Sequence, residues 1–97
     1  MKARVVSVQI RPGKTDEAIA LYRDSVVPAA RKQKGFKGAF LLNNSDTGKA
    51  LSLTLWETEA DMTSGEASDY FKEQLAKFGA VFSAPPAREH YDISVQV

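Results

Sequence analysis

Strand-like runs of apolar and polar residues mark four segments of the chain, each bounded by turn-forming residues. In the first, Val6, Val8 and Ile10 share one side of the predicted strand, as a period of two requires. A polar connection at residues 44–48 joins the second and third segments as a β-hairpin. The four predicted strands span residues 3–11, 36–43, 49–57 and 88–97.

Apolar residues at helical spacing fill the gap between the first two strands. Thr15 is the expected N-cap, and the helix is expected to continue to about Lys34. Pro28 lacks a backbone N–H group, so we expect it to bend or interrupt the helix near Ser25. Gly35 is the expected C-cap, because glycine readily adopts the left-handed conformation that ends many helices.

A second helical region is predicted before the last strand. Thr58 and Asp61 resemble a capping box that begins a short helix, and Ser64-Gly65 is where we expect that helix to break. Beyond the break, large apolar side chains recur mostly every three or four residues, which indicates a helix packed on a sheet. These side chains are Tyr70, Phe71, Leu75, Phe78 and Phe82.

The element order strand, helix, strand, strand, helix, strand predicts one α+β domain over residues 1–97 with the ferredoxin-like βαββαβ architecture. Its four-stranded antiparallel sheet would carry helices on one face only. The strands present apolar side chains to both faces, so the open face should be covered by a second subunit. We therefore expect a homodimer formed through that face, with roughly 1,600 Å² or more buried.

Composition narrows the classes of partner. Thirteen Lys and Arg against twelve Asp and Glu leave a formal charge of +1, which disfavours nucleic acid as a partner. The basic cluster Arg31, Lys32 and Lys34 suits the carbonyl end of a helix. The chain has no cysteine, as is common in a reducing cytosol, and no apolar run long enough to cross a bilayer. The expectation is a cytoplasmic protein that binds no membrane.

Three segments, in order along the chain, resemble landmarks of the antibiotic biosynthesis monooxygenase (ABM)-like family of dimeric α+β barrels. They are VPAARKQKGFKG at residues 27–38, LWETEA at 55–60 and SDYFKE at 68–73. The resemblance covers nearly the whole chain and implies the same fold. It implies no single chemistry, because the family includes cofactor-free oxygenases, quinol oxidases, heme degraders and members without known activity.

The resemblance leads us to hypothesise a cofactor-independent monooxygenase of a small aromatic or quinol-type molecule. The anthrone-oxidising branch implies an asparagine four residues before the strand tryptophan and a tyrosine soon after it. Here Trp56 matches, but Ser52 and Met62 stand at or near those two places. We expect Trp56 to form a wall of the substrate site, with Ser52 and Tyr22 as hydrogen-bonding groups. Packing in a core or dimer seam is the alternative role for Trp56.

His90 is the only histidine and lies two residues from Asp92 on the same side of the last predicted strand. The two could form a catalytic base, although a lone strand histidine commonly makes only surface or interface hydrogen bonds. One histidine and no cysteine leave too few preferred ligands for a transition metal, so neither a metal nor another cofactor is expected.

Two further expectations follow from the resemblance. The family could also supply a non-catalytic dimer, either a small-ligand-binding module for an apolar or aromatic molecule or a stress-response module. We further expect no heme degradation, because the second tryptophan and the heme-ligating histidine of the heme-degrading branch fall on Gly65 and Leu75. Neither residue can replace a porphyrin-contacting ring or an iron ligand.

Overall fold

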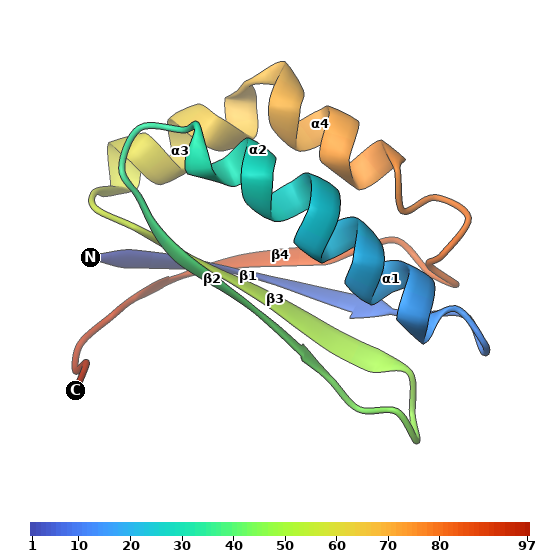
Figure 1. Cartoon of the computed structure of the whole chain (residues 1–97). Helices are drawn as coiled ribbons and strands as arrows, with labels where there is room; N and C mark the ends of the chain where they lie inside the picture. Colours follow the sequence, from blue (N-terminus) through green and yellow to red (C-terminus); the bar gives the residue numbers. More distant parts are fainter.

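Four antiparallel strands form one sheet in a computed structural model that describes residues 1–97 (Figure 1). The strands are β1 (Lys2–Gln9), β2 (Phe36–Asn43), β3 (Lys49–Trp56) and β4 (Ala87–Asp92). Their order across the sheet is β2-β3-β1-β4. β1 therefore pairs with β3 on one side and with β4 on the other, and β2 and β4 are the two edge strands. This order confirms the ferredoxin-like α+β fold.

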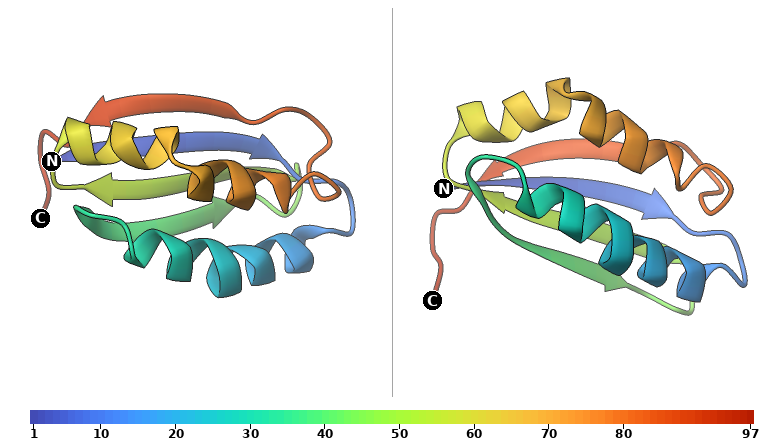
Figure 2. Two further views of the ribbon diagram at one scale, coloured as in Figure 1. Left: turned by 90° about the horizontal axis from the view of Figure 1, so that it is seen from above. Right: turned by 45° about the horizontal axis from the view of Figure 1, so that its top comes forward.

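Two helical regions cover one face of the sheet and lie side by side across it (Figure 2). The first contains α1 (Thr15–Leu21), the π-helical turn η1 (Tyr22–Val26) and α2 (Val27–Arg31), and the second contains α3 (Glu59–Ala67) and α4 (Asp69–Ala76). None of these helices is both long enough and apolar enough to pass through a lipid bilayer.

The interruption predicted near Ser25 is confirmed, and it takes the form of η1. Val27 N–H donates to the carbonyl of Tyr22, five residues back, and Pro28 follows at the start of α2 without an N–H to donate. Two boundary predictions were wrong. Lys14, not Thr15, is the N-cap, and α2 ends at Arg31 rather than near Lys34.

The second helical region begins as predicted but breaks later. Thr58 Oγ1 accepts a hydrogen bond of 3.1 Å from Asp61 N–H at the start of α3. The break lies at Ser68 and not at Ser64-Gly65. Gly65 stays within α3, and a Cβ there would only make ordinary van der Waals contact with the Trp56 ring, at 3.5 Å. Phe78 and Phe82 lie beyond the end of α4.

The last strand is shorter than predicted, because β4 ends at Asp92 and not at Val97. Asp92 pairs with Lys2, the first residue of β1, so the ladder ends there. Beyond this point Ile93 N–H donates to the carbonyl of Met1.

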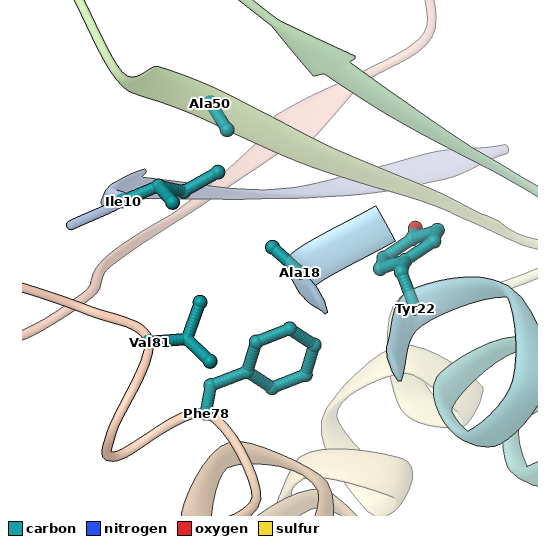
Figure 3. Close-up of a cluster of buried hydrophobic side chains, with 6 residues drawn as sticks. All are labelled: Ile10, Ala18, Tyr22, Ala50, Phe78 and Val81. Atoms are coloured by element: carbon teal, nitrogen blue, oxygen red, sulfur yellow. The ribbon is translucent and has the colours of Figure 1, made fainter. Parts of the chain in front are cut away.

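The main core cluster lies between the sheet and the helices (Figure 3). It joins side chains from β3, from the first helical region and from the segments that follow β1 and α4: Ile10, Ala18, Tyr22, Ala50, Phe78 and Val81. Phe78 and Val81 come from the segment after α4, so that segment closes this end of the core. Tyr22 carries the only hydroxyl group of the cluster.

Candidate functional site

A cavity of about 70 Å³ lies between the helices and the covered face of the sheet. It is largely apolar, since 13 of its 17 lining residues are hydrophobic. Polar atoms reach it from Arg4, Tyr22, Ser52, Thr54, Tyr70 and Gln74. A few polar groups converging on an apolar space are typical of a site for a small organic molecule. The volume is roughly half of the ~150 Å³ that accommodates benzene in an engineered cavity, so an aromatic ligand needs side chains to move.

Tyr22 and Ser52 both line the cavity and form a hydrogen-bonded pair there, while the substrate-binding role expected of them stays a prediction. Ser52 Oγ donates to the Tyr22 hydroxyl at 3.0 Å, and that hydroxyl donates to the carbonyl of Phe40 at 3.2 Å. Burial raises the pKa of the Tyr22 phenol above its ordinary 10.0, and the hydrogen bond from Ser52 opposes the rise. Tyr22 is therefore a neutral phenol over the physiological pH range.

Arg4 is a buried cation that lines the same cavity, with only 3% of its side chain exposed. Its Nη1 lies 3.2 Å from Glu66 Oε2 and 3.4 Å from the Met62 carbonyl, and its Nη2 donates to the Tyr70 hydroxyl at 3.3 Å. The guanidinium carbon also lies 5.1 Å from the centre of the Trp56 ring and 4.4 Å from that of Phe71. Cation–π contacts thus add to the ion pair.

Glu66 gathers three basic side chains around one carboxylate. Besides Arg4, its Oε1 lies 3.2 Å from Arg88 Nε and its Oε2 lies 2.7 Å from His90 Nε2. The Glu66 side chain is 9% exposed, whereas Arg88 and His90 are 48% and 37% exposed. Oε2 receives no well-directed hydrogen bond despite these short distances, so the attraction there is chiefly between charges.

The predicted base is not assembled, because His90 and Asp92 are held by different partners. His90 lies against Glu66 on α3, and Asp92 forms an ion pair with Lys2 on β1. That hydrogen bond to Lys2 holds the pKa of Asp92 below its ordinary 3.8. Neither residue lines the cavity. The two residues lie on the same side of β4, but each forms its ion pair with a residue of another element and not with the other.

Trp56 does not form a wall of the cavity either. Its side chain is fully buried, its Nε1 donates to Thr54 Oγ1 at 2.9 Å, and its ring packs edge-on against Phe36. It contacts the site indirectly, as one of the rings beside Arg4. The packing alternative for Trp56 describes its position better than the substrate-wall expectation.

Arg4, Glu66 and Tyr70 belong to the site but were not singled out from the sequence. One signal was present for Arg4: it shares the strand face of Val6, Val8 and Ile10, where a charged residue is unusual. Nothing in the sequence identified its partners, because Met62 and Tyr70 are 58 and 66 residues away. No group of three or more His, Asp or Glu side chains is placed to hold a metal ion.

A polar contact joins the two helical regions at Gln74, which is one of the residues that line the cavity. Ser25 Oγ in η1 donates to Gln74 Oε1 in α4 at 2.9 Å, and Lys77 Nζ donates to Ser25 Oγ at 2.6 Å. We call this contact the Ser25–Gln74–Lys77 latch. It ties α4 to the π-helical turn, so separating the two regions requires these bonds to break.

Comparison with known sequences identifies relatives of the chain. The model of a family described as antibiotic biosynthesis monooxygenase matches residues 1–77. The uncharacterised protein Rv2557 of Mycobacterium tuberculosis is 31% identical over 93 residues, which cover 95% of this chain. The uncharacterised protein Rv2558 of the same organism is 30% identical over 94 residues. This chain spans only 40% and 39% of the lengths of these two relatives.

Solved structures share the fold. A monooxygenase of Streptomyces coelicolor, solved in complex with the ligand nanaomycin D, superposes with a TM-score of 0.84 at 17% identity, over 99% of this chain and 89% of that one. A Bordetella bronchiseptica protein described as a candidate antibiotic biosynthesis monooxygenase has a TM-score of 0.84 at 21% identity, over 97% of both chains. At these identities the likeness shows a common fold and not a common substrate.

Proposed function

Because this chain belongs to the antibiotic biosynthesis monooxygenase family, we propose that it is a cofactor-independent oxygenase of a small aromatic or quinol-type molecule. The observation that carries the proposal is the apolar cavity, in which the hydroxyl groups of Tyr22 and Ser52 meet. Such a space can hold an aromatic ring and exclude water from it. The activity fits a protein whose family and fold neighbours are described as monooxygenases.

The reaction balances without a cofactor when the substrate is a quinol. Its ring loses two electrons in becoming a quinone and two more when one ring C–H becomes C–OH. These four electrons reduce O₂, so one oxygen atom enters the ring hydroxyl and the other leaves as water with two protons from the substrate. The protein has only to bind the ring, favour its ionised form and keep the site dry.

The cavity supplies hydrogen bonds but no obvious proton acceptor. Tyr22 and Ser52 can bind a substrate oxygen in the role expected of them. No carboxylate or imidazole lines the cavity, and the earlier hypothesis of a His90–Asp92 base has no support in this geometry. The site must therefore stabilise the ionised form of its substrate, because an ordinary phenol has a pKa of about 10 and is almost wholly neutral near pH ~7.

Oxygen uptake with a panel of quinols, anthrones and flavonols tests the proposal. We expect turnover by the wild type and a loss of about tenfold in Tyr22→Phe, which corresponds to the loss of one hydrogen bond worth about 1.4 kcal/mol. Tyr91→Phe is the matched control, because it also removes a phenol oxygen, but from a tyrosine that lies outside the cavity and donates its hydroxyl hydrogen to Glu89. His90→Ala should keep its activity. Uptake no faster than buffer with every substrate would reject the oxygenase.

A second candidate function is ligand binding without turnover, and the missing proton acceptor favours it. The same cavity would then hold an apolar or aromatic molecule as cargo or signal. Binding of a panel compound with unchanged oxygen uptake and no change in the compound after incubation would establish this function. The tests on the two functions use the same compounds and variants.

We also propose that the chain forms a homodimer through the sheet face opposite the helices. Phe40 and Leu42 on β2 are 54% and 50% exposed on that face. In the sheet register they lie beside Leu53 and Leu51 of β3, so they continue an apolar row. An apolar patch of this kind is typical of an interface. Analytical ultracentrifugation should show a dimer for the wild type and a monomer for Leu42→Lys. A monomeric wild type at micromolar concentration would reject the interface.

A further inference from the structure

Arg4 has more hydrogen-bond donors than the protein satisfies. A guanidinium group carries five N–H donors, and the Met62 carbonyl, Glu66 and the Tyr70 hydroxyl are its three polar partners. At least two N–H groups therefore have no acceptor in the protein, although no Arg4 nitrogen is both fully buried and without any partner. Buried donors normally find a partner. Because Arg4 lines the cavity, a ligand there can supply one.

The charges around Arg4 also call for an anion. Arg4 and Arg88 both contact Glu66, the only carboxylate within ion-pair distance of either, so two positive charges face one negative charge. The cluster has a net charge of +1 with His90 neutral, and more if His90 is protonated. Water can solvate Arg88 and His90 because they are partly exposed, but Arg4 is buried. Glu66 pairs with Arg4 but cannot neutralise Arg88 as well, so the cluster keeps a net positive charge beside the cavity, which favours an anionic ligand there.

The surroundings of Arg4 fit an anionic oxygen carried by an aromatic ring. Trp56 and Phe71 lie over the guanidinium, so its N–H edge is the part left to bind an oxygen atom. The rest of the cavity is apolar and suits a ring. Hydrogen bonds from a guanidinium to an ionised oxygen are about twice as strong as those between neutral groups.

We infer that Arg4 binds the ionised oxygen of the ligand, so that the cavity selects aromatic molecules with a phenolate or enolate oxygen. The inference deepens the proposed function and rests on the same cavity. Arg4 would favour the ionised over the neutral form of an acidic substrate, which compensates for the absence of a proton acceptor. Its contact with the Tyr70 hydroxyl places a second polar group beside that oxygen.

Trp56 provides a built-in reporter for the test, because it is the only tryptophan and contacts Arg4. We would titrate 4-nitrophenolate and the uncharged analogue nitrobenzene and follow quenching of its fluorescence. The wild type should bind 4-nitrophenolate about tenfold more tightly, a difference of about 1.4 kcal/mol. The visible absorbance of the bound probe should show a pKa lowered by about one unit, the same free energy.

The decisive variant is Arg4→Met combined with Glu66→Leu, which removes both buried charges and leaves neither unpaired. It should bind the two probes equally and leave the pKa of bound 4-nitrophenol at its solution value. Arg88→Met is the matched control, because it removes a cation from the same carboxylate outside the cavity, and it should keep more of the preference than the double variant, since the hydrogen bonds to the ligand come from Arg4. The titrations with both probes are repeated in a second background, in which each protein also carries Gln74→Ala to enlarge the cavity.

The outcomes separate this inference from the proposed function. Equal binding of both probes by the wild type, or a preference that persists without Arg4, overturns the role of Arg4 and leaves the apolar cavity intact. A preference that depends on Arg4, together with no oxygen uptake on any panel substrate, supports the anion site and rejects the oxygenase. If neither probe binds in either background, both proposals fail.

Discussion

Replacing Glu66 by leucine should destabilise the protein more than replacing either of the partly exposed residues that contact it, Arg88 and His90. The substitution leaves Arg4, which is 3% exposed, without its only carboxylate. Removing one partner of a buried ion pair costs about 3–5 kcal/mol, because the remaining charge stays buried and unpaired. A domain of this size has a total stability of about 5–15 kcal/mol, so the variant should be close to its limit of folding.

The contribution of the outer cations should be much smaller. Arg88 and His90 are 48% and 37% exposed, so water can solvate them once Glu66 is gone. Partly exposed ion pairs contribute about 0–1 kcal/mol. Arg88→Met should therefore cost about 1 kcal/mol or less. The difference between the two variants separates the buried part of the cluster from its exposed part.

Urea unfolding followed by Trp56 fluorescence is the assay, at one fixed protein concentration because association would add to the apparent stability. Glu66→Leu should lower the free energy of unfolding by about 3–5 kcal/mol. In a parallel thermal scan the melting temperature should fall by at least about 12 °C, from about 4–8 °C for each kcal/mol in a domain of this size. The double variant Arg4→Met/Glu66→Leu should recover much of the loss, since an apolar pair can replace a buried ion pair at little cost. A loss below about 1 kcal/mol in Glu66→Leu, or strictly additive effects of the two substitutions, would refute this account.

Three further predictions concern the cavity. Burial raises the pKa of Tyr22 above 10.0 in the folded chain. The stability that its neutral hydroxyl contributes is therefore complete below pH 10 and is lost as the pH rises through the folded-state pKa. In Tyr22→Phe the free energy of unfolding measured in urea should therefore fall less steeply at alkaline pH. Ser25→Ala removes the latch contact to Gln74, and stopped-flow measurement should show faster association of nitrobenzene; an unchanged rate would contradict the role of the latch. Hemin should produce no saturable Soret shift at one heme per subunit, because Leu75, which lines the cavity, offers no atom that can bind iron.

The fold could be predicted because its determinants are local. Alternation predicts the strands wherever one face is buried, and Pro28 predicts the interruption of the first helix since it has no N–H to donate. Boundaries set by pairing were less predictable. The length of β4 depends on where β1 runs out of partners at Lys2, and residues 93–97 alone carry no sign of that limit.

Two of the residues singled out from the sequence lie at the cavity, and the substrate-binding role expected of them stays a prediction. Tyr22 and Ser52 were expected to be hydrogen-bonding groups, and they meet at the cavity from η1 and β3. The His90–Asp92 hypothesis used neighbours along one strand, but ion pairs in the folded chain are chosen by distance in space. Glu66 and Lys2 reach those two residues from other elements, and no periodicity in the sequence indicates that pairing.

The cavity and the proposed dimer face are linked through one residue of β2. The carbonyl of Phe40 accepts the hydrogen bond from the Tyr22 hydroxyl, while its side chain is 54% exposed on the open face of the sheet. β2 is an edge strand, held on one side by β3 alone. A second subunit packed on Phe40 would restrain this edge and with it the acceptor that orients Tyr22. Dimer formation and ligand affinity should therefore weaken together in Leu42→Lys, although residue 42 lies outside the cavity lining.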